Sequence, residues 1–235
     1  MLISTMYHHI NSDKYSNNLD IFINHLKYIK SNYNIVLPND NISSNSICLT
    51  FDDAFFDFYY YIFPLLKKFN MKVILAVPVK YILEDTLVSS NDRLSISHDD
   101  SYSNKESFCT YKELKKMVDS KLVYIASHSY SHTNLTMSNN LSLEIIESKS
   151  ILEKKLNIKV DTFIFPFGKY DKRVLDMCKR YYKYLFRIGN GMNKDFNGVK
   201  GLIYRINADN LKDEKNIFSK KNIFKYKLKS LIKSF

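Results

Sequence analysis

Two groups of residues in this chain could together hold a metal ion and move a proton. Asp52 and Asp53 end a T-F-D-D segment that follows a short apolar run. His128 and His132 lie four residues apart after another apolar run. Adjacent carboxylates at the end of a strand point to different sides, so that one can bind a metal while the other handles a proton. One carboxylate and two imidazoles form a three-ligand set that leaves metal positions open for water and substrate.

Each group also has a purely structural interpretation. An Asp pair often starts a loop or caps a helix, and in isolation that interpretation is the better one. A His pair can simply lie on the surface or in the core, whereas these two imidazoles reach one point if the backbone turns helically after the strand. Since two of the six histidines stand at ligand spacing after a strand, we favour the metal site.

A third segment, Phe165–Gly168, reads F-P-F-G. Proline restricts the backbone and glycine permits close approach, so this loop could present backbone N–H groups and an aromatic wall to a ligand. An ordinary strand-to-helix turn capped by Asp171 explains the same residues equally well.

Short apolar runs that predict strands alternate with segments of helical period along the chain. Such alternation predicts a parallel sheet, and about seven such units close into a barrel more readily than they form an open sheet. The carboxyl ends of parallel strands gather functional groups, and all three segments above fall at such ends. The predicted strands are Leu2–Met6, Ile47–Phe51, Lys72–Val77, Leu122–Ala126, Thr162–Phe165, Tyr184–Ile188 and Leu202–Ile206.

Helices are predicted where apolar residues recur at helical spacing or where caps occur. Pro64 predicts a kink or a second start in one of these helices. Asn39–Ser46 and Ser89–Ser107 are polar and predicted to be loops, the second long enough to form an active-site wall. The predicted helices are Leu19–Ile29, Phe56–Phe69, one beginning at Thr110 with a capping box to Glu113, Leu141–Leu156 and Asp171–Tyr181.

The composition suits one globular domain inside the cell. The chain has 235 residues, is 45% hydrophobic and carries a formal charge of +11. That charge favours acidic partners, although a generally basic proteome explains it as well. The basic residues do not interleave with a base-stacking platform, so we expect no nucleic-acid partner. Three scattered cysteines and a start without a signal-peptide pattern lead us to expect a cytoplasmic protein.

The three segments occur in the order and spacing of the polysaccharide deacetylase family, the NodB-like carbohydrate esterases. Asp52 and Asp53 match its T-F-D-D block, His128 and His132 its H-[ST]-x-x-H block, and Phe165–Gly168 resembles its P-[YF]-G block. The flanks are similar too: the Tyr7-His8 pair resembles one on the first strand of the branch that deacetylates surface glycans. The other similar flanks are Phe63–Lys68 and Thr110–Leu114.

This resemblance implies an α/β fold, a distorted (β/α) barrel of about seven parallel strands. It implies that Asp53, His128 and His132 hold one divalent ion, Zn²⁺ or a substitute such as Co²⁺ or Ni²⁺. Asp52 would be the general base. The substrate-binding residues that it implies or suggests are Pro166, Phe167, Gly168, Tyr7, His8 and Arg205.

The function implied is removal of acetyl from an N-acetylated sugar of a bacterial surface polysaccharide or its precursor. One alternative keeps the metal site but hydrolyses another C–N amide. A second is a glycan-binding protein on the same fold that has lost turnover.

Three departures from the family pattern support that second alternative. Ala54 replaces the usual Gly after the Asp pair, Ile164 stands where many members have an Arg, and the late L-x-H block has no His. Arg205 resembles a late R-I pair of the surface-glycan branch and could contact the base or the substrate. His8 or His98 could replace the missing general acid.

Residues 1–210 are expected to form the barrel domain, and residues 211–235 a basic amphipathic tail. From residue 217 onwards the tail has six lysines and no acidic residue. A basic amphipathic helix can lie on an anionic membrane. The alternative is a helix that packs its apolar face on the barrel, and we prefer it because such barrels often end with a covering helix. The apolar face comprises Phe224, Leu228, Leu231, Ile232 and Phe235.

Overall fold

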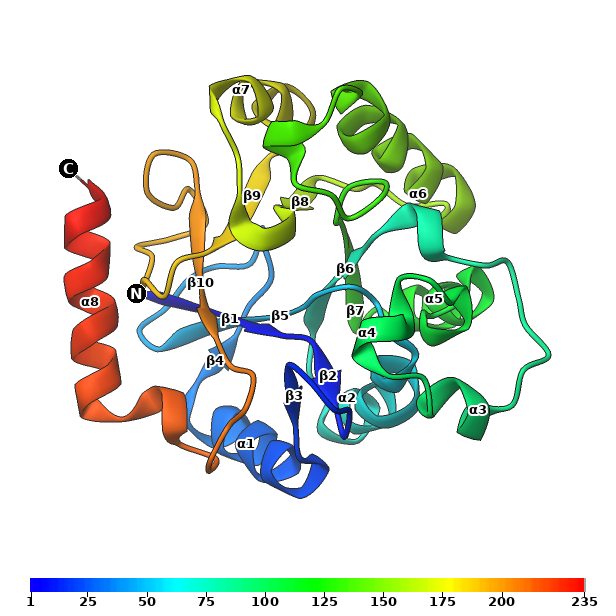
Figure 1. Cartoon of the computed structure of the whole chain (residues 1–235). Coiled ribbons are helices and arrows are strands. Elements are labelled where there is room, and N and C mark those ends of the chain that lie inside the picture. Colours follow the sequence, from blue (N-terminus) through cyan, green and yellow to red (C-terminus); the bar gives the residue numbers. More distant parts are fainter. Residues whose placement is uncertain (235) are drawn as a thin grey trace.

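Seven parallel strands form a closed barrel in the computed structural model, which describes the backbone of residues 1–234 and the side chains of residues 1–233 (Figure 1). Each of the seven predicted strands is confirmed to within two residues at either end. In the order in which they pair around the barrel they are β1 (Leu2–Tyr7), β10 (Ile203–Asn207), β9 (Tyr184–Ile188), β8 (Thr162–Ile164), β7 (Val123–Ser127), β6 (Val73–Val77) and β5 (Ser46–Phe51).

The barrel closes because β1 pairs on both sides. One edge of β1 aligns with β5 along its whole length, from Leu2 opposite Ser46 to Tyr7 opposite Phe51. The other edge aligns with β10, where Thr5 lies opposite Ile206. The short strand β4 (Asn34–Ile35) extends β5 outside the ring, and β2 (His9–Ile10) and β3 (Ser16–Asn17) form a separate small sheet.

Alternation along the strands divides the buried side chains into two layers. On β6, Val73, Leu75 and Val77 pack against the surrounding helices, whereas Ile74 and Ala76 belong to a second apolar cluster. Leu2, Cys48 and Ile203 from other strands share that second cluster, which fills the barrel interior. Successive side chains of a strand point to opposite faces, so position along each strand decides which residues can reach the interior.

Helices surround the barrel as the sequence predicts, with local caps at their starts (Figure 1). The capping box of Thr110 and Glu113 begins α5 (Tyr111–Asp119), and Asp171 caps α7 (Lys172–Tyr181). Pro64 lies in the first turn of α2 (Phe63–Phe69), directly after a π-helical turn at Phe58–Ile62, so it marks a second start. The long helices are α1 (Leu19–Asn32), α2 (Phe63–Phe69), α5 (Tyr111–Asp119), α6 (Ser148–Leu156, preceded by a π-helical turn at Ser142–Glu147), α7 (Lys172–Tyr181) and α8 (Lys220–Ser234).

The segment Ser89–Ser107, predicted to be a loop, contains α3 (Ser90–Leu94), α4 (His98–Ser101) and a 3₁₀ turn at Lys105–Ser107. Each begins at a polar residue whose side-chain oxygen accepts a hydrogen bond from a backbone N–H of the first turn. These capping residues are Ser89, Ser97 and Asn104. The buried Arg93 guanidinium ties the segment to α5 through Glu113, with Nη1 2.7 Å from Oε1. Short capped helices escape a periodicity search because they span little more than one turn.

The tail packs differently from the expectation. Ile217 and Phe218 are buried, and the Phe218 ring stacks on His25 of α1 at 5.5 Å. On α8, however, the apolar side chains that were expected to cover the barrel are exposed at Phe224, Leu228, Leu231 and Ile232, and Phe235 lies outside the described residues. The preferred prediction of a covering apolar face is therefore wrong, because α8 contacts the barrel through its opposite side. Among the described residues, no helix combines the length and apolar character needed to cross a bilayer.

Candidate active site

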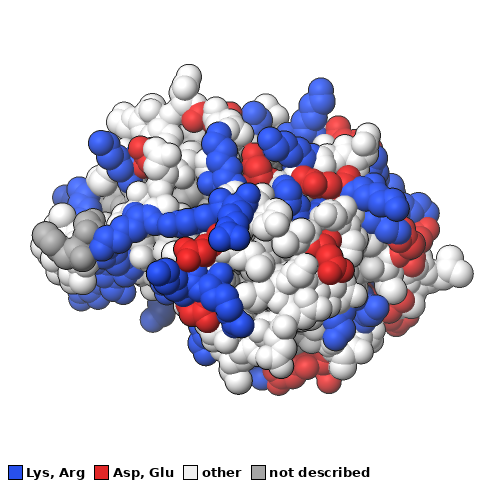
Figure 2. Space-filling view, turned by 90° about the horizontal axis from the view of Figure 1, so that it is seen from above, with Lys and Arg blue, Asp and Glu red and all other residues white. Residues whose placement is uncertain are grey.

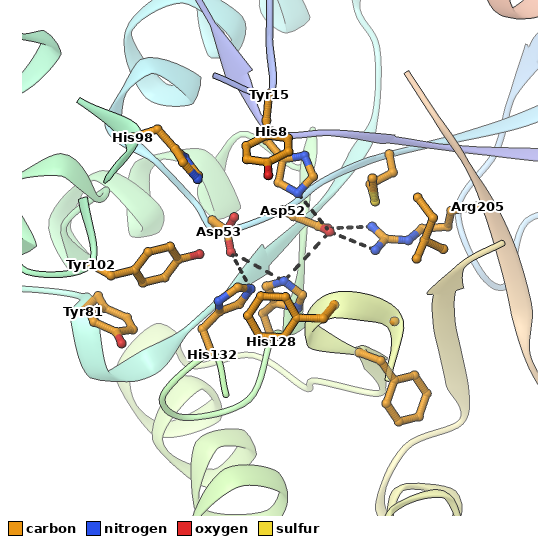
Figure 3. Close-up of a pocket in the computed structure, with 15 residues that line it drawn as sticks. His8, Tyr15, Asp52, Asp53, Tyr81, His98, Tyr102, His128, His132 and Arg205 are labelled. Carbon is orange, nitrogen blue, oxygen red and sulfur yellow. Dashed lines mark hydrogen bonds and ion pairs between the residues drawn. The ribbon is translucent and has the colours of Figure 1, made fainter. Parts of the chain in front are cut away.

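A pocket of about 520 Å³ lies at the carboxyl ends of the barrel strands (Figure 3). Its floor carries the charged side chains and its walls are largely aromatic. The lining residues are Met6, His8, Tyr15, Asp52, Asp53, Tyr81, His98, Tyr102, His128, His132, Phe165, Phe167, Gly168, Ile188 and Arg205.

Asp52 and Arg205 meet at the pocket floor from β5 and β10. Arg205 donates two hydrogen bonds to the carboxylate, from Nη1 to Oδ1 at 2.6 Å and from Nη2 to Oδ2 at 2.8 Å. Its Nη1 also donates to the Thr50 hydroxyl at 2.9 Å. Thr50 and Asp52 follow the interior residue Cys48 by two and four positions, and Arg205 follows the interior residue Ile203 by two. Because side chains alternate between the two faces of a strand, all three point inward.

The Asp52–Arg205 pair is nearly inaccessible to solvent, with Arg205 only 1% exposed. Burial alone would raise the pKa of Asp52, but the Arg205 guanidinium, with smaller contributions from His128 and His8, holds it well below its usual range. Asp52 is therefore ionised at physiological pH, and its two hydrogen bonds to Arg205 fix its orientation. Of the two contacts expected for Arg205, with the base or with the substrate, the structure shows the one with Asp52.

Asp53, His128 and His132 converge beside this pair (Figure 3). Asp53 Oδ1 lies 3.5 Å from His128 Nε2 and 3.3 Å from His132 Nε2, and no hydrogen bond satisfies this buried oxygen. The three candidate ligand atoms all lie within 4.8 Å of one another. A buried carboxylate oxygen without a donor, facing two imidazole nitrogens, is the arrangement that a divalent cation would complete.

Hydrogen bonding and burial leave both imidazoles able to act as ligands. His128 Nδ1 lies 2.7 Å from the Ile164 carbonyl oxygen, which can only accept, so Nδ1 carries the proton and Nε2 presents a lone pair to Asp53. Burial lowers the pKa of His132 to about 4 despite the opposing charge of Asp53. His132 is thus neutral at physiological pH, and the residues fit a metal ion.

The turn after β5 depends on two left-handed residues. Asp53 has φ of 69° and Ala54 has φ of 54°. This conformation suits Asp better than most residues, but it strains Ala, whose Cβ crowds the backbone. The family's usual Gly after the Asp pair avoids that strain. Ala54 therefore adopts the turn that Gly would, at an energetic cost, and the position of Asp53 is preserved.

The two histidines converge through a loop and not through the helical turn that we considered as the way to bring them together. Ser129 and His132 have φ of 65° and 50°, and no helix includes them. Glu144, 5% exposed, holds this loop by accepting hydrogen bonds from the backbone N–H groups of Tyr130 and Ser131 at 3.0 and 2.9 Å. Glu144 was not selected from the sequence. The one indication there is an acidic residue among apolar residues at the start of a helix.

His8, at the end of β1, reaches the pocket with a partner that the sequence did not indicate. Its Nδ1 lies 2.8 Å from Asp209 Oδ2, and its Nε2 lies 3.9 Å from Asp52 Oδ2. Burial lowers the pKa of His8, but the hydrogen bond to Asp209 and the charges of Asp209, Asp52 and Asp53 together raise it to about 9. His8 is therefore a protonated imidazolium that faces the Asp52 carboxylate.

Two predicted substrate-binding residues do not line the pocket. Tyr7 precedes His8 on the strand and so points outward, where its hydroxyl lies 2.8 Å from His25 Nε2 in the buried layer under α1. Pro166 is buried behind the pocket wall, whereas Phe167 is 59% exposed at its rim. Gly168 has φ of 63°, and a Cβ there would lie 2.5 Å from Ile188 Cγ2, so only glycine fits.

Another wall of the pocket is formed by aromatic side chains from the segment Ser89–Ser107 and from the loop between β2 and β3 (Figure 3). Tyr102 stacks on His132 with ring centroids 4.9 Å apart, and its buried hydroxyl has no hydrogen-bond partner among the described residues. Tyr15 packs edge-on against His98 at 4.9 Å. The prediction that this segment forms an active-site wall is confirmed, although the sequence did not identify Tyr15 or Tyr102.

The fold and this site define a NodB-like (β/α) barrel with a candidate metal centre at the carboxyl ends of its strands. A family model described as polysaccharide deacetylase matches residues 39–184. The chain belongs to the polysaccharide deacetylase family.

Among curated proteins, the chain is similar to the poly-beta-1,6-N-acetyl-D-glucosamine N-deacetylase of Escherichia coli O157:H7, with 22% identity over 181 residues. That alignment covers 64% of this chain and 26% of the relative, so the chain spans about a quarter of the relative's length.

Solved structures share the fold. A polysaccharide deacetylase from Bacillus cereus superposes with a TM-score of 0.77 at 20% identity, covering 94% of this chain and 68% of that one. The Streptococcus pyogenes deacetylase PplD, solved with acetate, gives a TM-score of 0.74 at 22% identity, covering 92% and 96% of the two chains.

Proposed function

We propose that this protein is a metal-dependent N-deacetylase that removes acetyl from an N-acetylated sugar of a surface polysaccharide or its precursor. The observation that carries the proposal is the pairing of a fixed, ionised Asp52 with the Asp53–His128–His132 group on one pocket floor. The aromatic walls suit a sugar ring, whose C–H faces pack against such side chains.

A divalent ion held by Asp53, His128 and His132 would supply Lewis acidity to the acetamide carbonyl and lower the pKa of water. The protein's own groups then handle the protons. Asp52, fixed by Arg205, accepts the proton of the attacking water, for which its two oxygens are held in one orientation. As the C–O bond forms and the C–N bond breaks, acetate and an amine are produced, and the amine nitrogen needs a proton.

His8 is the proposed donor of that proton. It is the imidazolium that faces Asp52, and Asp209 keeps it charged, with a pKa of about 9. His98, the other candidate, has a pKa lowered chiefly by burial and then by His9, so it is a poorer acid source at neutral pH. The geometry therefore favours His8 over His98 in place of the family's late His.

The first test combines metal content with turnover in four proteins. We expect about one divalent ion per chain in the wild type and in Asp52→Asn, and none in Asp53→Ala or His128→Ala. Acetate release from N-acetylglucosamine oligomers should fall by about 10²–10⁴-fold in Asp52→Asn, because only the base is lost.

Three outcomes separate the alternatives. Glycan binding without acetate release under zinc, cobalt or nickel would establish the binding-protein interpretation. Turnover of other amides with no action on acetylated sugars would establish the amidohydrolase. An ion retained in both ligand variants would place the metal elsewhere.

A second test isolates the role of His8 by changing the leaving group. His8→Asn should slow hydrolysis of the acetamide, whose amine must be protonated, by about 10²-fold or more. An aryl acetate leaves as a stable phenolate, so its hydrolysis should change little. Equal losses on both substrates would show that His8 positions Asp52 instead of donating a proton.

A further inference from the structure

Helix α8 attaches to the barrel by one narrow side. Tyr226 is 9% exposed, and the Ser230 hydroxyl both donates to the Met192 carbonyl at 2.8 Å and accepts from the Met192 N–H at 2.7 Å. One turn further, Lys233 lies over the Tyr204 ring at 5.0 Å. These contacts at helical spacing fix which side of α8 faces the barrel, and so also which side faces away.

The side that faces away is apolar. Phe224 is 68% exposed, Leu228 50%, Leu231 60% and Ile232 66%. Residues at this spacing form one continuous stripe along a helix. Single exposed apolar side chains are ordinary on protein surfaces, but a contiguous stripe marks an interaction site.

Lysines border the stripe on both sides. By helical periodicity Lys220 and Lys227 lie along one edge, and Lys221, Lys225 and Lys229 along the other. All five are exposed, and none forms an ion pair with a described acidic side chain. At the left edge of Figure 2, the side of the molecule on which α8 lies, the coloured side chains beside the grey atoms are blue, and red side chains lie further toward the middle.

We propose that the outer face of α8 binds the surface of an anionic lipid bilayer, with the helix lying in the plane of the membrane. The four apolar side chains would enter the boundary between headgroups and acyl chains, while the two rows of lysines reach the anionic headgroups. A second copy of the chain is a poorer occupant, because docking the two stripes would bring like-charged rows together. Nucleic acid would leave the apolar stripe in water.

The test is sedimentation of the purified full chain with vesicles of phosphatidylcholine alone or mixed with phosphatidylglycerol. We expect binding to the mixed vesicles at least tenfold tighter than to the neutral ones, and weakened by salt. Leu228→Ser with Leu231→Ser should weaken this binding at least tenfold. Leu87→Ser, at a fully exposed leucine outside α8, is the matched control and should bind within twofold of wild type.

Two results would overturn the proposal. One is equal binding of the double variant and the wild type to anionic vesicles, with circular dichroism showing both folded. The other is a dimer in solution that the double variant dissociates, which would assign the stripe to a second copy. Neither result bears on acetate release, since α8 contributes no residue to the pocket.

Discussion

The pocket floor and the outer face of α8 differ in how their charged side chains are arranged. On the floor, Asp52 and Arg205 are buried and joined by two hydrogen bonds, which fix the position of both charges. On α8 the charges share one sign, face solvent and surround apolar side chains that a folded barrel would normally bury. Catalysis needs charged groups in fixed positions, whereas attraction to an extended charged surface needs only a high density of charges of the opposite sign. Substitutions should therefore have large effects in the first region and small effects in the second.

The largest effect is expected from Arg205→Met. The Asp52 carboxylate would remain buried without its cation, which should lower the free energy of unfolding by about 3–5 kcal/mol. The pKa of Asp52 should rise, because the largest contribution that opposes burial would be lost. Denaturant unfolding measures the first effect. Arg205→Lys, which keeps the charge but not the paired hydrogen bonds, should fall between wild type and Met. An unchanged unfolding curve would break the contrast between the two regions.

A pH effect of about 3 kcal/mol is expected from His8 in the metal-free protein. Its pKa is about 9 in the folded chain against 6.5 as the ordinary value. The stabilisation is fully present below pH 6.5, where folded and unfolded chains both hold the proton. It is lost as pH rises to about 9, because the unfolded chain has already released that proton. Unfolding followed from pH 6 to 9.5 should show this slope in wild type and not in His8→Asn.

Ala54→Gly should stabilise the protein by about 1 kcal/mol, because glycine adopts the left-handed conformation without strain. The melting temperature should rise by a few degrees. Ala76→Gly in β6 is the control, since it should destabilise a residue in ordinary strand geometry. A lower melting temperature for Ala54→Gly would mean that the turn is not strained.

The smallest effect is expected on α8. Leu231→Ser should change the free energy of unfolding by less than about 0.5 kcal/mol, because the side chain is already 60% exposed. Tyr226→Ala on the inner side should cost several times more. Similar costs at the two positions would mean that the stripe is covered in the folded protein, and the contrast with the pocket would fail.

The sequence by itself was sufficient to predict the seven strands and the main helices. It was also sufficient to select Asp52, Asp53, His128 and His132 as candidate site residues. These features are local: apolar runs, caps and ligand spacing are each visible within a few residues. Alternation within a strand also predicts that Tyr7 and His8 point to opposite faces, so that only His8 can reach the pocket. The short helices of Ser89–Ser107 and the loop between the histidines were not predictable from periodicity.

Only the tertiary structure decided which distant groups meet. Arg205 reaches Asp52 across 153 residues of sequence, and Asp209 reaches His8 across 201. Closure of the barrel through β1 brings β5 and β10 to its two edges, and no local pattern encodes that alignment. The orientation of α8 was likewise set by Tyr226 and Ser230 finding partners on the barrel. The sequence determined which chemical groups are available, and strand register determined their partners, because pairing energies depend on distances that only the closed barrel creates.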